Sequence, residues 1–313
     1  MTDYGHDLLF GAFITPAAQP AMHAVELAVV ADRAGLDLAM FQDHPYQPAF
    51  LDTWTLLSYV ASRTEQIHVS GNVLNLPLRH PAVIARSAAS LDLLSGGRFE
   101  LGIGVGAFWD AIEAMGGRRL APGQSIQALE EAIGIIRGIW DTKERGGVRL
   151  DGEYYQVNGT KRGPAPAHDI GIWVGAYKPR ILKLTGRLAD GWLPGLSYLP
   201  GGPADLEKMN KHIDEGAASA GRDPSAVRRF LNISGQFAQS GASLLVGPPQ
   251  QWAEELAAIT LEYGVTGFIM MADDAPSIEL FAAEVAPATR ELVAAERATP
   301  GDGRSSGMYS ASN

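Results

Sequence analysis

Short apolar runs alternate with longer segments of helical periodicity along this chain. The first run ends at Thr15-Pro16, and brief, uninterrupted apolar runs of this kind indicate strands that are buried on both faces. Eight such runs predict strands, and they cover residues 8–14, 38–41, 67–74, 99–103, 170–174, 191–193, 230–234 and 267–271.

The predicted strands are followed by segments whose apolar residues recur every three or four positions. The clearest stripe, which predicts an amphipathic helix, consists of Ile126, Leu129, Ile133, Ile136 and Trp140. Further helices are predicted at residues 23–34, 54–62, 81–95, 179–187, 204–220 and 249–263, and from residue 277 onward. An excursion at residues 148–157, with Asp151-Gly152 between two short runs, predicts a hairpin.

Eight strand-then-helix units in order predict a parallel sheet covered by helices. The count of eight favours an α/β fold closed into a (β/α)8 TIM barrel with loop insertions over an open doubly wound sheet. We expect one domain over residues 1–297, because no low-complexity linker divides them, and a disordered tail over residues 298–313. In such barrels the chemistry lies in the loops after the carboxyl ends of the strands.

Composition narrows the classes of protein to consider. The 313 residues are 46% hydrophobic and contain no cysteine, which allows a large core and excludes disulfides and thiolate metal sites. The net charge of −10 argues against a nucleic-acid partner, and we interpret Arg118-Arg119, Lys161-Arg162 and Arg228-Arg229 as solvated loops. No apolar stretch reaches membrane-spanning length and no signal peptide is seen, so a cytoplasmic protein without a membrane partner is expected.

Asp43-His44 follows the second predicted strand and is the candidate for proton chemistry. A histidine can donate or accept a proton near neutral pH, and an adjacent carboxylate can help to orient its ring. The alternative is that Asp43 caps the loop while His44 packs as an ordinary polar residue. The position at a barrel strand end favours the catalytic interpretation.

The turn after the fourth strand carries Gly104, Val105 and Gly106. Residues 102–107 weakly resemble a dinucleotide-binding fingerprint, but they lie in the fourth unit and are followed by Phe108-Trp109 rather than by a helix start. We interpret the glycines as allowing a flat ring or a phosphate to lie against the backbone. A plain tight turn is the alternative.

Gly175, Ala176 and Tyr177 follow the fifth strand, and Pro179 marks the start of a helix. Free backbone N–H groups and the helix dipole attract anions there, which predicts a phosphate site, with a plain strand-to-helix turn as the alternative. No two histidines stand three or four residues apart, so no metal site is predicted.

Several segments, in the same order along almost the whole chain, resemble the luciferase-like monooxygenase family. Residues 91–104 (LDLLSGGRFELGIG) are similar to the family's signature, and residues 75–85 (NLPLRHPAVIA) to a segment upstream of it. Residues 163–166 followed by 173–176 resemble the entry to the family's phosphate loop, and residues 189–192 read ADGW, as in the family.

The resemblance implies a (β/α)8 barrel that uses coenzyme F420, or reduced FMN with oxygen. A second strand ending in Asp-His resembles F420-dependent members, so F420 is the expected cofactor and FMN the alternative. The resemblance also implies a non-proline cis peptide between Asn72 and Val73 beneath the ring, with Asn75 among the cofactor-binding residues. Relatives that oxidise sugar phosphates carry a glutamate where Ala107 stands, a departure that argues against that substrate and its proton-transfer scheme.

The main hypothesis is an oxidoreductase that transfers a hydride between F420 and a small, partly apolar organic molecule. An FMN-dependent monooxygenase is the rival on the same fold, and a non-catalytic flavin-binding or assembly protein is the rival from another class. Residues 45–52, 108–124 and 196–203 are expected to select the substrate, and Trp109 and Trp192 to shape its pocket. The resemblance further suggests a homodimer.

Overall fold

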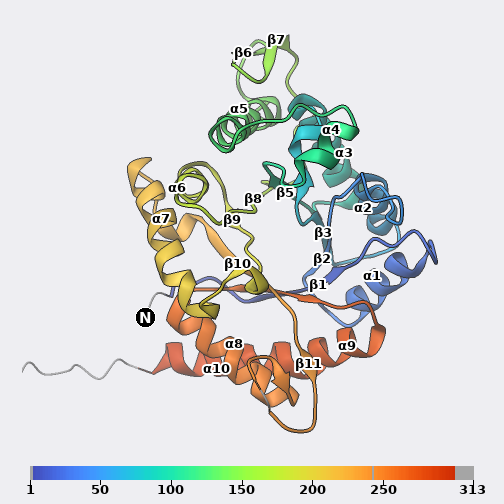
Figure 1. Cartoon of the computed structure of the whole chain (residues 1–313), viewed down its shortest axis with the longest axis vertical. Coiled ribbons are helices and arrows are strands. Elements are labelled where there is room, and N and C mark those ends of the chain that lie inside the picture. The colour runs from blue at the N-terminus through green and yellow to red at the C-terminus, as the bar shows by residue number, and fades with distance from the viewer. Residues whose placement is uncertain (1–2, 242, 300–313) are drawn as a thin grey trace, which may run out of the picture.

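The computed structural model describes residues 3–241 and 243–299, and these form a closed barrel of eight parallel strands surrounded by helices (Figure 1). Neighbouring strands pair in the order β3-β2-β1-β13-β10-β9-β8-β5, and a pairing between β3 and β5 closes the ring. The barrel strands are β1 (Leu9–Ile14), β2 (Leu38–Phe41), β3 (His68–Gly71), β5 (Phe99–Gly104), β8 (Ile172–Val174), β9 (Gly191–Trp192), β10 (Arg228–Ile233) and β13 (Gly267–Met271). The predicted (β/α)8 barrel is confirmed.

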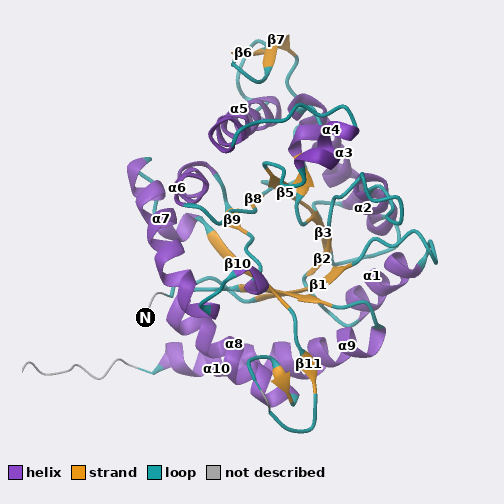
Figure 2. Ribbon diagram, in the orientation of Figure 1, coloured by secondary structure: helices purple, strands orange, loops and turns teal. Residues whose placement is uncertain are grey.

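Helices form the outer layer of the molecule, and Figure 2 shows them as a ring around the strands. They are α1 (His23–Arg33), α2 (Thr53–Ala61), α3 (Pro81–Ser95), α5 (Pro122–Trp140), α6 (Pro179–Leu188), α7 (Asp205–Ser219), α8 (Pro249–Tyr263), α9 (Ala275–Leu280) and α10 (Ala286–Ala298). None of the helices within these described ranges is long and apolar enough to cross a membrane.

Alternation along the strands divides the core into two parts. Side chains such as Ala39 and Phe41 of β2 pack outward in the large cluster beneath the helices. Their neighbours Leu38 and Met40 point the other way and meet Trp173 and other residues inside the barrel. The barrel interior is therefore a packed core, and a ligand has to bind beyond its ends.

The third strand departs from its predicted course. It was expected to run without a break over residues 67–74, but β3 ends at Gly71 and a two-residue strand, β4 (Leu74–Asn75), resumes after Asn72 and Val73. The peptide bond between Asn72 and Val73 is cis, which confirms the expectation drawn from the family resemblance. β4 pairs with β5 alone, so the chain leaves the barrel wall at this point.

The structure adds to or differs from the sequence prediction in three local details. A short helix, α4 (Trp109–Ala114), begins directly after the glycine turn, where no helix start was expected. The predicted hairpin is present, with strands β6 (Val148–Asp151) and β7 (Gln156–Thr160), and its turn runs from Gly152 to Tyr155. A small parallel pair, β11 (Gln236–Phe237) and β12 (Val246–Gly247), was not predicted.

Arg228-Arg229 is not a solvated loop but part of β10. Arg229 is fully buried and donates a hydrogen bond to Asp214 Oδ1 at 2.5 Å, and its guanidinium lies over the ring of Tyr4. The charge is tolerated in the core because Asp214 neutralises it. The predicted disordered tail begins at residue 298, where α10 ends, and residues 300–313 lie outside the described residues.

Candidate functional site

Segments from four strand ends meet at the carboxyl-terminal end of the barrel. β2, β4, β5 and β8 end at Phe41, Asn75, Gly104 and Val174, and the predicted site residues lie at or directly beside these positions. Because all four strands are parallel, their carboxyl ends lie on one face of the barrel. The fold thus brings the sequence-predicted site segments together.

The buried carboxylate of Asp43 binds two other segments of the chain. Its Oδ2 accepts a hydrogen bond from the backbone N–H of Asn75 at 2.8 Å and one from Arg79 Nε at 3.1 Å, and its Oδ1 accepts from Arg79 Nη2 at 3.0 Å. Arg79 also donates to Asp52, the residue that caps α2. Asp43 therefore joins the loops after β2 and β4, and among the described residues it makes no hydrogen bond to His44.

His44 lies half-buried in a group of aromatic side chains. Its ring stacks on Tyr46 with 5.4 Å between the ring centroids, and Phe108 approaches it edge-on at 5.3 Å. Burial lowers the pKa of His44, and the nearby Asp43 carboxylate only partly opposes that shift. Within residues 3–241 and 243–299 no hydrogen bond engages the imidazole, so a mostly neutral ring has both nitrogens available for a ligand.

Val73 connects three of the predicted segments. A Cβ atom placed on Gly104 would lie 2.5 Å from Val73 Cγ2, and one placed on Gly175 would lie 3.4 Å from the same methyl group. The Val73 side chain therefore occupies the space that these two glycines leave open. Any residue larger than glycine at position 104 would collide with it.

Asn72 is held by a partner from the far side of the barrel. Its Nδ2 donates to Asn232 Oδ1 at 2.6 Å, and the amide of Asn232 lies 3.4 Å from Asn72 Oδ1. Asn232 belongs to β10, 160 residues further along the chain. The hydrogen bonds between Asn72 and Asn232 hold the backbone at Asn72, directly before Val73, in place.

Asn75 presents a buried acceptor beside the glycine turn. It pairs in register with Gly104, and its Oδ1 has no hydrogen-bond partner among the described residues. An unpaired buried carbonyl costs free energy, so a ligand that donates an N–H to it would be favoured. Val105 packs against the main core, and Gly106, with φ of +88°, turns the chain where few other residues would fit.

The loop after β8 leads to the N-terminus of α6. The amide N–H of Gly175 is directed at Ile103 O at 3.4 Å, whereas no group among the described residues accepts from the amides of Ala176 and Tyr177. The Tyr177 hydroxyl accepts a hydrogen bond from the amide of Gly195 at 2.8 Å. Two of the three predicted N–H groups are thus available to an anion.

Of the two tryptophans expected to shape the pocket, Trp109 is half-buried and Trp192 is fully buried. Trp109 begins α4, and its ring lies close to Gly106, at the predicted turn. Trp192 is fully buried, and its Nε1 donates to Ala176 O at 2.8 Å. It supports the β8–α6 loop from beneath and is not accessible to a ligand.

Arg79 and Asn232 belong to the site, and the sequence interpretation assigned no role to either. Arg79 lies in the segment that carries the family resemblance, and Asn232 is a polar residue inside an apolar strand. Each of these two signals, a family-like segment or a polar residue within an apolar strand, indicates a candidate functional residue. Neither reveals its partner, because Asp43 is 36 residues away from Arg79 and Asn72 is 160 residues away from Asn232.

Comparisons with known proteins agree with this fold. The model of the luciferase-like monooxygenase family matches residues 8–240. The chain is 33% identical over 220 residues to a 5,10-methylenetetrahydromethanopterin reductase from Methanolobus tindarius, covering 70% of this chain and 63% of the relative. It is 32% identical over 221 residues to an F420-dependent glucose-6-phosphate dehydrogenase from Gordonia bronchialis, covering 67% of this chain and 62% of the relative.

Among solved structures, an F420-dependent secondary alcohol dehydrogenase in complex with an F420–acetone adduct superposes with a TM-score of 0.79. It is 18% identical in sequence, and the superposition covers 91% of this chain and 99% of that one. These features define the class as parallel (β/α)8-barrel proteins with a candidate site at the carboxyl-terminal end of the barrel. The chain belongs to the luciferase-like monooxygenase family.

Proposed function

We propose that this protein is an F420-dependent oxidoreductase that transfers a hydride between the deazaflavin and a small, partly apolar organic molecule. The observation that carries the proposal is the half-buried, unengaged imidazole of His44 at the same barrel end as the surface formed by Val73, Gly104 and Gly175. The two relatives described above, one of which is named for F420, support this choice of cofactor.

The residues at this surface fit a deazaflavin. Asn72, Val73, Asn75, Gly104, Val105 and Gly106 are proposed to bind the ring. The unpartnered Oδ1 of Asn75 suits a ring N–H donor, and the side chain of Val73, which fills the space beside Gly104, offers an apolar support for a flat ring. Gly175, Ala176 and Tyr177 are proposed to bind the cofactor phosphate, chiefly through the amides of the latter two at the start of α6.

When bound, F420 supplies a ring carbon that accepts or releases a hydride. His44 is the proposed catalytic residue, because its neutral imidazole can take a proton from a substrate hydroxyl or return one to a carbonyl. Asp43 contributes by position: it anchors the loop that carries His44 to Arg79 and to the backbone of Asn75. The aromatic rings of Tyr46 and Phe108 reduce access of water to the imidazole.

The side chains around His44 indicate the substrate class. Phe108 and Tyr198 are more than half exposed, and Tyr177 pairs with Tyr198 at 5.5 Å between ring centroids. Phe108 and Tyr198 come from the segments assigned to substrate selection, and Tyr177 comes from the proposed phosphate loop. An aromatic surface of this kind favours a substrate with an apolar part, and Ala107 offers no carboxylate for a sugar phosphate scheme.

The proposal includes a homodimer formed through α2 and α3. Tyr59, Val83 and Leu94 are exposed apolar residues on these helices, with Leu94 87% exposed. Val83 and Leu94 lie eleven residues apart, three turns along one helix face, and Ser87 and Ser90 between them are small enough for a second helix to approach closely. Light scattering on the purified protein should give twice the mass of one chain. In the Leu94→Glu variant the measured mass should fall toward that of a single chain.

A cytoplasmic location is also proposed, because the deazaflavin, whether oxidised or reduced in the reaction, has to be returned to its starting redox state by a second redox enzyme. Cell fractionation tests it directly: recovery of the protein with the secreted fraction would contradict it.

The proposed function is tested by titrating the protein separately with F420 and FMN, and then assaying alcohols and ketones with each cofactor. Saturable binding of F420, with substrate-dependent bleaching or recovery of its absorbance, is the expected result. Tighter binding of FMN together with oxygen consumption would instead establish the monooxygenase. Binding without any turnover across the panel would support the non-catalytic alternative.

A further inference from the structure

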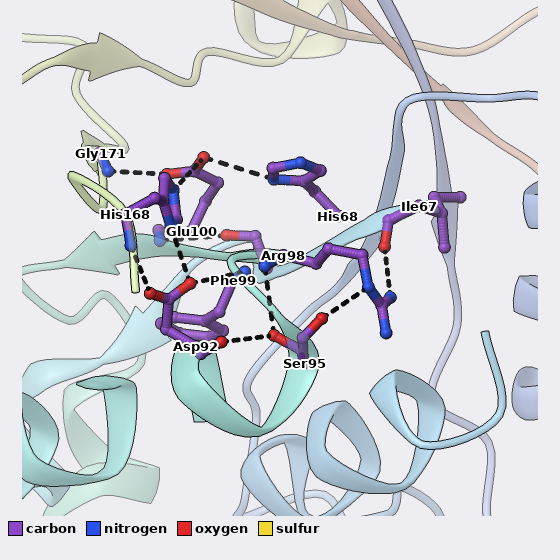
Figure 3. A network of polar contacts seen from close by, with 11 residues as sticks. Ile67, His68, Asp92, Ser95, Arg98, Phe99, Glu100, His168 and Gly171 are labelled. Atoms are coloured by element: carbon purple, nitrogen blue, oxygen red, sulfur yellow. Dashed lines mark hydrogen bonds and ion pairs between the residues drawn. The ribbon is translucent and has the colours of Figure 1, made fainter. Parts of the chain in front are cut away.

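The amino-terminal end of the barrel, opposite the candidate cofactor site, carries a second cluster of polar side chains. His68 is the first residue of β3, Glu100 is the second residue of β5, and His168 lies four residues before β8. Figure 3 shows the two imidazole rings directed at the carboxylate of Glu100. Nothing in the proposed hydride transfer uses these residues.

The spacing of the three side chains matches a metal-ligand set. His168 Nε2 lies 3.2 Å from Glu100 Oε1, and His68 Nδ1 lies 3.5 Å from the same oxygen. One atom from each residue lies within 4.8 Å of the other two. Zinc binds nitrogen and oxygen at about 2.0–2.2 Å, so neighbouring ligand atoms in a tetrahedral site stand roughly 3.3–3.6 Å apart.

The groups behind the ligands are arranged as in protein metal sites. His168 Nδ1 lies 2.8 Å from Oδ1 of the fully buried Asp92, and this contact leaves Nε2 as the nitrogen that faces Glu100. Glu100 Oε2 accepts a hydrogen bond from the amide of Gly171 at 2.7 Å, which leaves Oε1 for the centre of the cluster. A carboxylate behind a histidine ligand orients the ring and raises its basicity.

Exposure allows both entry of an ion and a fourth ligand. The side chains of His68 and His168 are 36% and 29% exposed, whereas Glu100 is 13% exposed. A water molecule can therefore complete a tetrahedron from the solvent side.

We propose that His68, Glu100 and His168 bind a divalent transition-metal ion of the zinc class. The ion would join β3, β5 and the segment that enters β8 at the end of the barrel that serves stability rather than catalysis. Histidine binds a metal ion only through a deprotonated ring nitrogen, so binding is measured at pH 8 rather than at pH 6.

The experiment uses the tag-free, chelator-treated protein and Co²⁺ as a spectroscopic probe, followed by displacement with Zn²⁺. The expected result is one equivalent of Co²⁺ with the intense visible absorption of a tetrahedral ion, lost on adding Zn²⁺. Zn²⁺ should also raise Tm, because it binds the folded chain. Absence of saturable binding, or an octahedral spectrum only, would overturn the proposal.

Two variants and one control locate the ion. His68→Gln and Glu100→Gln should each weaken Co²⁺ binding at least roughly 10-fold, and His68→Gln changes the least buried ligand if Glu100→Gln does not fold. His80→Asn alters a histidine outside the cluster with a residue that also caps α3, and it should bind Co²⁺ normally. Normal binding by folded His68→Gln would show that the ion lies elsewhere and would refute the site.

Discussion

Arg79 donates two parallel hydrogen bonds to the buried carboxylate of Asp43, from Nε at 3.1 Å and from Nη2 at 3.0 Å. Only arginine presents two donors in the geometry of a carboxylate. Arg79→Gln would leave the Asp43 charge buried without a counter-charge, and we expect a loss of about 3 kcal/mol in the free energy of unfolding. Urea denaturation measures this loss.

The exposed Arg63→Gln is the matched control, and it should change the unfolding free energy by less than about 0.5 kcal/mol. Arg79→Lys should lie between wild type and Arg79→Gln, because it keeps the charge and loses the two-point contact. Equal stability of Arg79→Gln and Arg63→Gln would mean that the ion pair does not organise the loop.

His44→Ala tests the proposed catalytic role. If His44 transfers a proton in the rate-limiting step, kcat should fall by roughly 10²–10⁴-fold. Cofactor affinity should change little, because Val73, Asn75 and the glycine segments form the proposed binding surface. Single-turnover rates and cofactor titration together separate these effects, and a variant with near-normal kcat on its best substrate would remove His44 from the mechanism.

The pH dependence of turnover follows from the burial of His44. Burial lowers the pKa of His44 from its ordinary value of 6.5, so the neutral ring that accepts a proton persists to more acidic pH than usual. Alcohol oxidation should therefore stay constant near neutral pH and decline only below 6.5, and His44→Gln should lack this decline. The same shift makes the free energy of unfolding depend on pH. The stabilisation that His44 contributes by staying neutral in the folded protein is fully present above the pKa of the unfolded chain, and it is lost as the pH falls through the lowered pKa of the folded protein.

Gly104→Ala tests the contact between the glycine turn and Val73. The added Cβ would stand 2.5 Å from Val73 Cγ2, and we expect a cost of about 1–3 kcal/mol in unfolding free energy together with weaker cofactor binding. In a Val73→Ala background the same change should cost at least about 1 kcal/mol less, since the colliding methyl is gone. Gly134→Ala, in α5, would place its Cβ in ordinary contact with Leu150 Cδ1 at 3.9 Å and should be neutral or slightly stabilising.

The sequence predicted those features whose cause is local. Hydrophobic periodicity located the barrel strands and most of the helices, because each element buries one face or both within a few residues of chain. The cis bond at Asn72-Val73 was expected from the resemblance to a family, and Gly71 followed by the polar Asn72 within an apolar run also suited a bulge there. The local pattern indicates a bulge but does not by itself specify a cis peptide.

The sequence could not predict contacts that the closed barrel creates. Arg229 looks like a solvated charge until folding brings Asp214 and Tyr4 to it. The ligand set of His68, Glu100 and His168 is spread over a hundred residues, so a search for short histidine spacings misses it. In both cases the partners come from elements that meet only in the folded protein.

Positions 73, 104 and 175 divide one fixed volume among them, because the Val73 methyl groups fill what two glycines leave empty. Redesign of this barrel for a bulkier or differently shaped cofactor therefore has to treat the three positions as one unit. Substitution at position 104 alone should yield mostly poorly folded variants, because any added side chain collides with Val73 Cγ2. Combinatorial libraries that place a smaller residue at position 73 and a larger one at position 104 or 175 should instead preserve folding. In such variants the side chain that supports the cofactor ring would come from position 104 or 175 rather than from position 73.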